Sequence, residues 1–143
     1  MSKTMILAVG GAGCNMAETI MRVANAHWVK EATYLFADSD MERLSELGKK
    51  GFETLSIQCD SDSFPTDKLQ GVEKLYILAG LGGVTGSKFA EIAAKVAQSD
   101  GVENVALIVT IPSFSRAQIN RQRPPRHLNL FRTCLSRFLI TRN

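Results

Sequence analysis

The sequence predicts an α/β domain in which a mostly parallel sheet forms the middle of three layers, with helices on both faces. Apolar runs of strand length alternate along the chain with segments of helical periodicity, which is typical of a parallel sheet. Each run is almost continuously apolar, as expected of strands that are buried on both faces. The predicted strands are residues 5–9, 33–37, 75–79 and 105–112, and residues 52–58 are a further candidate.

Three helices are predicted between these strands. Residues 14–29 place apolar side chains such as Met16, Ile20 and Trp28 at helical spacing. Residues 41–51 and 87–101 show similar patterns, and glycines stand near the end of each. Ligands of such sheets bind at the carboxyl ends of the strands, so the turns that follow the strands are the candidate site.

Composition favours a single cytoplasmic domain. The chain has 143 residues, of which 45% are hydrophobic and 22% charged. No apolar stretch approaches the roughly 18 residues of a membrane span, and the N-terminus lacks the pattern of a signal peptide. The three cysteines are widely spaced, and we interpret them as reduced structural thiols.

Charge divides the chain into two parts. Residues 1–110 hold ten basic and fourteen acidic side chains, whereas residues 111–143 hold seven arginines and no acid. We therefore predict a domain over residues 1–112 and a basic, atypical tail over 113–143. Such a tail can be a nucleic-acid-binding arm, or it can be foreign to the original fold, as after a frameshift. The scarcity of interleaved aromatic residues disfavours nucleic acid.

Two glycine-rich segments follow predicted strands and precede predicted helices. They are GGAGCN at residues 10–15 and GLGGVTGS at residues 80–87. Glycine lets backbone N–H groups approach an anion, and the dipole of a helix that follows favours the same ligand. Two such segments suit a di- or triphosphate that is held from two sides. Ser87 suits either a phosphate contact or a helix cap.

A third polar turn, DSD at residues 38–40, follows the second predicted strand. Three interpretations of its acids remain open. Asp38 could bond a ribose hydroxyl, the acids could lie near a phosphate-bound Mg²⁺, or Asp40 or Ser39 could cap the next helix.

Known phosphate-binding patterns fit this chain only in part. No lysine precedes the serine as a P-loop requires, because Lys88 follows Ser87. An NAD(P)-binding oxidoreductase domain, with Gly11 and Gly13 as its fingerprint and Asp38 on the ribose, is an alternative. That alternative leaves GLGGVTGS unexplained.

The order GGAGCN, ADSDMERL, AGLGGVTGS and IVTIP, over roughly residues 4–112, resembles the tubulin/FtsZ GTPases. The resemblance implies a Rossmann-like fold, GTP or GDP as ligand, and self-association or an FtsZ-like partner. The sequence departs from the family's phosphate signature at Val84 and Lys88. The nucleotide-binding residues that the resemblance and the turns together indicate are Gly10, Gly11, Ala12, Gly13, Cys14, Asn15, Asp38, Asp40, Gly82, Gly83, Val84, Thr85, Gly86, Ser87 and Asn143.

The region after residue 112 departs further from the family. The family's Glu that contacts the nucleotide is missing from PSFSRAQINR, and a double proline stands at 124–125. Residues 136–143 resemble the next strand of the family and place Asn143 at a guanine-contacting position. The acidic segment G-x-x-N-x-D-x-x-D, which completes the GTPase site of the next subunit in the family, is absent. We therefore expect a diverged or truncated member with weak or no hydrolysis on its own.

Overall fold

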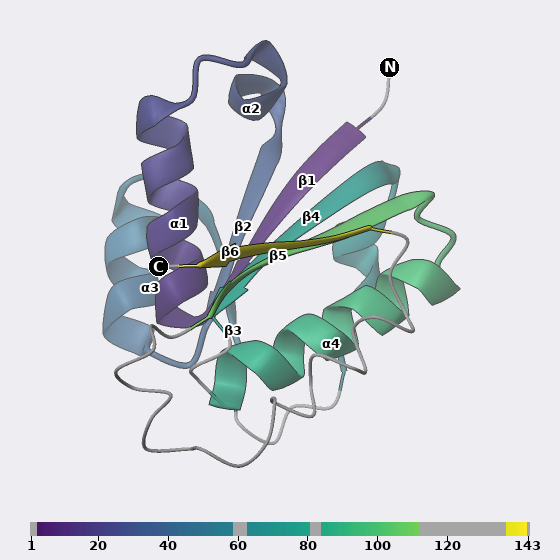
Figure 1. Cartoon of the computed structure of the whole chain (residues 1–143). Helices are drawn as coiled ribbons and strands as arrows, with labels where there is room; N and C mark the ends of the chain where they lie inside the picture. The colour runs from purple at the N-terminus through teal and green to yellow at the C-terminus, as the bar shows by residue number, and fades with distance from the viewer. Residues whose placement is uncertain (1–2, 59–62, 81–83, 112–136, 143) are drawn as a thin grey trace.

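The computed structural model describes residues 3–58, 63–80, 84–111 and 137–142, and its centre is a six-stranded sheet (Figure 1). The spatial order is β3-β2-β1-β4-β5-β6, and every neighbouring pair is parallel. The predicted parallel α/β fold is therefore confirmed. The strands are β1 (Lys3–Val9), β2 (Thr33–Asp38), β3 (Glu53–Ser56), β4 (Val72–Gly80), β5 (Asn104–Ile111) and β6 (Arg137–Arg142).

Helices cover both faces of the sheet, as predicted. Figure 1 shows α1 and α3 on one face and α4 on the other. The helices are α1 (Gly10–Val23), α2 (His27–Glu31), α3 (Met41–Lys49) and α4 (Val84–Ser99), with the short 3-10 helix η1 (Thr66–Leu69) before β4.

The alternation of side chains along β1 shows how the two layers are filled. Met5, Leu7 and Val9 belong to the core cluster that includes the apolar face of α4. Ile6 and Ala8 belong to the cluster that includes α1 and α3. Because successive residues of a strand point to opposite faces, a continuously apolar strand is what a central position requires.

The prediction of one helix over residues 14–29 is wrong. The helix α1 ends at Val23, and Ala24 and Ala26 are extended before α2 begins at His27. The break lets Trp28 pack its ring against Tyr76 of β4, with the ring centroids 5.2 Å apart. Apolar spacing continues through the break because Trp28 contacts Tyr76, which belongs to the same cluster as Met16 and Ile20 of α1; Trp28 is still 48% exposed.

The starts of two helices also differ from the prediction. The helix α1 begins at Gly10 and α4 at Val84, so GGAGCN and the end of GLGGVTGS form helical first turns and not loops. Glycine is a weak helix former, which is why sequence patterns place it outside helices. The strand β3 is shorter than the candidate range of residues 52–58.

The resemblance of residues 136–143 to a strand is confirmed, because β6 pairs in parallel with β5 from Ala106↔Arg137 to Ile111↔Arg142. Among the helices of the described residues, none has both the length and the apolar character needed to cross a bilayer.

Candidate functional site

The candidate site lies at the edge of the sheet where the parallel strands end. There α1 follows β1 directly, two residues separate β2 from α3, and α4 begins shortly after β4. All three helices therefore start at the same edge and direct the positive ends of their dipoles toward it. This is the edge at which open parallel sheets bind their ligands.

The two glycine-rich segments meet at this edge. A Cβ built on Gly10 would lie 3.5 Å from the Cα of Gly86, and one built on Gly86 would lie 3.6 Å from the carbonyl oxygen of Val9. Gly10 has φ +71°, a left-handed conformation that turns the chain from β1 into α1 and that favours glycine. The starts of α1 and α4 therefore approach each other through backbone alone, which is the form of a cradle for an anion.

Other small residues in these segments are required by packing. A Cβ on Gly13 would lie 2.2 Å from the carbonyl oxygen of Leu78, and one on Gly80 would lie 2.6 Å from the Cβ of Ala12. The first turn of α1 is thus pressed against the end of β4. Gly11 differs, because a Cβ built there would meet nothing within 4 Å. Of Gly11, Gly13 and Gly80, only Gly11 lacks a reason in the packing of the described residues.

The N-termini of α1 and α3 are completed differently. Val9 stands at the N-cap of α1, and no side chain of the described residues caps that helix. The carboxylate of Asp40 caps α3 by accepting hydrogen bonds from the backbone N–H groups of Glu42 at 3.0 Å and Arg43 at 3.3 Å. The helix-cap interpretation of Asp40 is therefore confirmed.

Asp38 is buried at the end of β2 and stabilises its own turn. Its Oδ1 accepts hydrogen bonds from the backbone N–H of Ser39 at 2.7 Å and of Asp40 at 3.4 Å. Nearby, the thiol of Cys14 is fully buried in α1. Burial raises the pKa of this thiol to about 11, Asp38 adds to the rise, and Arg43 opposes it. Cys14 is therefore a protonated packing residue at neutral pH.

The remaining predicted residues are placed only in part. Gly82, Gly83 and Asn143 lie outside the described residues. Val84 and Thr85 form the start of α4, and Ser87 is buried in its first turns. No group of three or more His, Cys, Asp or Glu side chains that could hold a metal ion occurs within the described ranges.

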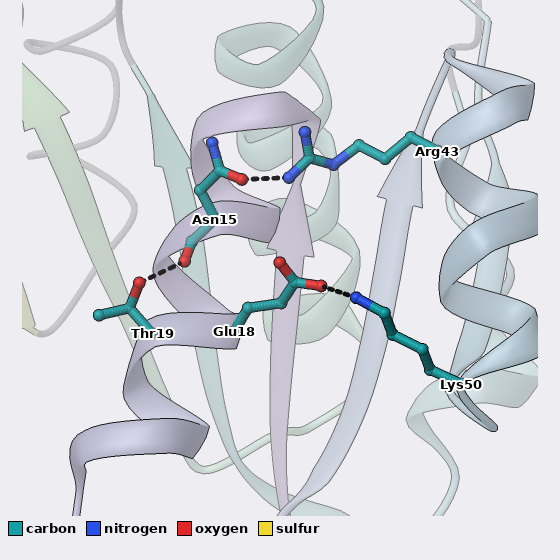
Figure 2. Close-up of polar contacts among 5 residues, drawn as sticks. All are labelled: Asn15, Glu18, Thr19, Arg43 and Lys50. Atoms are coloured by element: carbon teal, nitrogen blue, oxygen red, sulfur yellow. Dashed lines mark hydrogen bonds and ion pairs between the residues drawn. The ribbon is translucent and has the colours of Figure 1, made fainter.

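Arg43 is a residue of this edge that sequence reasoning missed. It lies in the first turn of α3, and its Nη2 donates a hydrogen bond to Oδ1 of Asn15 in α1 (Figure 2). Asn15 is exposed and is one of the predicted nucleotide-binding residues. The signal that could have identified Arg43 is its position three residues after the acids of DSD, at a strand end that also faces the start of α1.

Taken together, the fold and this edge define a class: parallel α/β domains in which two glycine-containing helix N-termini meet at the carboxyl ends of the strands. The chain is similar to curated relatives of one kind. It is 28% identical over 134 residues to the cell division protein FtsZ of Haloferax mediterranei, an alignment that covers 81% of this chain and 34% of that protein.

Solved structures show the same likeness in the fold. An FtsZ dimer from M. jannaschii superposes with a TM-score of 0.73 at 15% identity, covering 99% of this chain and 45% of that one. The structure of CetZ2 from Haloferax volcanii, described as a GTPγS-bound protofilament, superposes with a TM-score of 0.71 at 18% identity. The match covers 98% of this chain and 49% of that one. No family model matches the sequence.

The chain is therefore FtsZ/tubulin-like in sequence and in fold. It spans about a third of the length of the curated relatives it matches. The predicted resemblance to the tubulin/FtsZ GTPases is confirmed at this level.

Proposed function

We propose that the chain binds a guanine nucleotide, GTP or GDP, where α1 and α4 begin. The observation that carries the proposal is the approach of Gly10 to Gly86, at which the backbones of the first turns of α1 and α4 come close together. The absence of a side-chain cap on α1, within the described residues, leaves its first N–H groups suited to a phosphate.

The choice of a guanine nucleotide rests on the relatives. The similar curated proteins are named cell division proteins, and the similar CetZ2 structure is described as GTPγS-bound. In the proposal, the first turn of α1 from Gly11 to Asn15 holds the phosphates from one side. The segment from Gly82 to Ser87 holds them from the other side, and Asn143 contacts the guanine. Asp38 and Asp40 lie near the sugar or a companion Mg²⁺.

Hydrolysis by this chain alone is proposed to be weak or absent. In the tubulin/FtsZ family an acidic segment of the neighbouring subunit completes the GTPase site, and these 143 residues do not contain its pattern. The proposal therefore includes association with an FtsZ-like partner that carries this segment. Self-association and a cytoplasmic location are further parts of the proposal, although a second copy of these residues would not supply the segment.

Thermal shift with GDP, GTP, ATP and NADH tests the proposed ligand. Ligand at 100 times its dissociation constant adds about 2.7 kcal/mol to the free energy of unfolding, which raises the melting temperature by several degrees. We expect this shift with GDP and GTP only. A shift with NADH and none with GDP would show that the oxidoreductase alternative is correct.

A pair of matched variants tests the location. In Gly11→Val the added Cβ meets no atom of the described residues within 4 Å outside its own helix, so we expect the fold to tolerate it while a phosphate at the start of α1 is obstructed. Gly48→Val makes the same change at an equally open position of α3. We expect Gly11→Val to abolish the GDP shift and Gly48→Val to retain it. Equal shifts in both variants would place the ligand elsewhere.

A further inference from the structure

Two polar contacts connect α1 with α3 on the same face of the sheet (Figure 2). The guanidinium of Arg43 donates to the side-chain oxygen of Asn15, close to the edge where both helices begin. One helical turn further along α1, Nζ of Lys50 lies 3.3 Å from Oε1 of Glu18. We refer to them as the edge contact and the outer contact.

The guanidinium of Arg43 is held among groups of both helices. Its charge lowers the pKa of the buried Cys14 thiol, against the effects of burial and of Asp38, so it lies close to that thiol. Its Nε is buried and has no hydrogen-bond partner among the described residues. The side chain is half-buried, so packing and the edge contact restrict where its donors point.

The edge contact fixes the orientation of the Asn15 amide. Arginine has only donors, so the atom of Asn15 that faces it must be the oxygen Oδ1. Figure 2 shows Nδ2 pointing away from Arg43, toward the end of the sheet where α1 begins. The backbone oxygen of Asn15 accepts a hydrogen bond from Oγ1 of Thr19 at 2.9 Å. The exposed amide therefore presents two N–H donors at the candidate site.

We propose that Arg43 is a positioning residue for nucleotide binding: by holding Oδ1 of Asn15, it presents Nδ2 as a donor to an oxygen of the bound guanine nucleotide. This inference rests on the proposed function and adds to it a residue outside the glycine segments. Arg43 acts through Asn15 in this account, and not through its own charge on the phosphates.

A double-mutant cycle with a fluorescent GDP analogue tests the inference. Arg43→Met keeps the apolar stem and removes every donor, and Asn15→Ala removes the amide. We expect Arg43→Met to weaken binding by about tenfold when Asn15 is present and by less than about twofold in the Asn15→Ala background. Arg43→Lys, which restores a donor, should recover most of the affinity. Circular dichroism establishes that each variant is folded.

Lys50→Met is the matched control, because it breaks the outer contact between the same two helices. Its affinity for the analogue should equal that of the unmodified chain. An equal loss in Lys50→Met and Arg43→Met would show a structural role of the helix pair and overturn the inference.

Two further results would also overturn it. An equal effect of Arg43→Met with and without Asn15 would mean that the charge of Arg43 acts on the ligand directly, and no effect in either background would mean that Arg43 is not involved. If the unmodified chain does not bind the analogue at all, the proposed function is wrong and the inference fails with it. If the unmodified chain binds the analogue, a failed test counts against the role of Arg43 alone and not against the proposed function.

Discussion

The helices α1 and α3 begin at the same edge of the sheet and on the same face, yet their N-termini are completed in opposite ways. The chain supplies its own anion to α3, because the Asp40 carboxylate accepts from two backbone N–H groups. It supplies glycine to α1 and no side-chain cap among the described residues. Both helix dipoles favour negative charge at this position. The difference teaches that α3 is closed by the protein itself, whereas α1 is the start that remains suited to an external phosphate.

The largest expected difference between α1 and α3 comes from the tight packing of α1 against β4. Gly13→Ala places a Cβ 2.2 Å from the backbone oxygen of Leu78, and backbone cannot yield cheaply. We expect it to lower the free energy of unfolding by about 3 kcal/mol. Gly48→Ala in α3 meets nothing within 4 Å and should raise it by about 0.5 to 1 kcal/mol, because alanine is the better helix former. Urea denaturation measures both, and a loss of less than 1 kcal/mol for Gly13→Ala would contradict the packing argument.

The two helices also differ in their titratable groups: α1 buries the neutral thiol of Cys14, whereas the carboxylate of Asp40 caps α3. The folded pKa of Cys14 is raised from 9.0 to about 11, so above pH 9 the unfolded chain loses this proton while the folded chain keeps it. The free energy of unfolding should therefore fall as pH rises from 9 to 11, by about 2 kcal/mol from this group. Stability against pH, measured for the unmodified chain and for Cys14→Ala, isolates this contribution.

The variant Cys14→Ala should be less stable at neutral pH but should lack that part of the decline. Tyr34→Phe is a control, since burial also raises the pKa of Tyr34 and its removal should leave the contribution of Cys14 in place. Parallel curves for the unmodified chain and Cys14→Ala would show that the thiol titrates normally in the folded protein.

Removing the cap of α3 should have the smallest of these effects. Asp40→Ala leaves the N–H groups of Glu42 and Arg43 without their acceptor and should cost about 1 kcal/mol of unfolding free energy. Asp40→Asn keeps a capping oxygen and should cost only a few tenths. Equal losses for the two variants in urea denaturation would mean that the charge, and not the cap, stabilises α3.

The sequence predicted those parts of the fold in which a local residue pattern has a single physical cause. Continuously apolar runs predicted the central strands because a strand covered on both faces needs apolar side chains at every position. A helix cap at Asp40 or Ser39 was one of the open interpretations of DSD, because a short acceptor directly before an amphipathic segment satisfies free N–H groups, and the structure shows Asp40 in that role. The meeting of the glycine-rich segments followed from the shared edge of parallel strands.

Other parts depend on contacts between distant residues. Trp28 of the separate helix α2 contacts Tyr76, which lies 48 positions further along the chain, and such a contact is not visible in the spacing of one segment. Likewise, the pairing of Arg43 with Asn15 depends on two helices lying side by side, which periodicity within one segment does not reveal. Gly13 looks like a phosphate-loop glycine in the sequence, and only the position of Leu78 shows that packing also requires it.

The strand order has a consequence for how the chain folds as it is synthesised. The central strand β1 pairs on one side with β2, which follows closely, and on the other with β4, which begins at Val72. The first half of the chain therefore leaves the ribosome with one edge of β1 unpaired, and the start of α1 lacks its support from Leu78 until β4 arrives. Exposed edges of this kind favour pairing with other chains, and long-range parallel pairing is slow. At a synthesis rate of roughly 5–20 residues per second, several seconds pass between the synthesis of β1 and that of β4. During synthesis, the open edge of β1 is therefore covered only when β4 has been made and pairs with it.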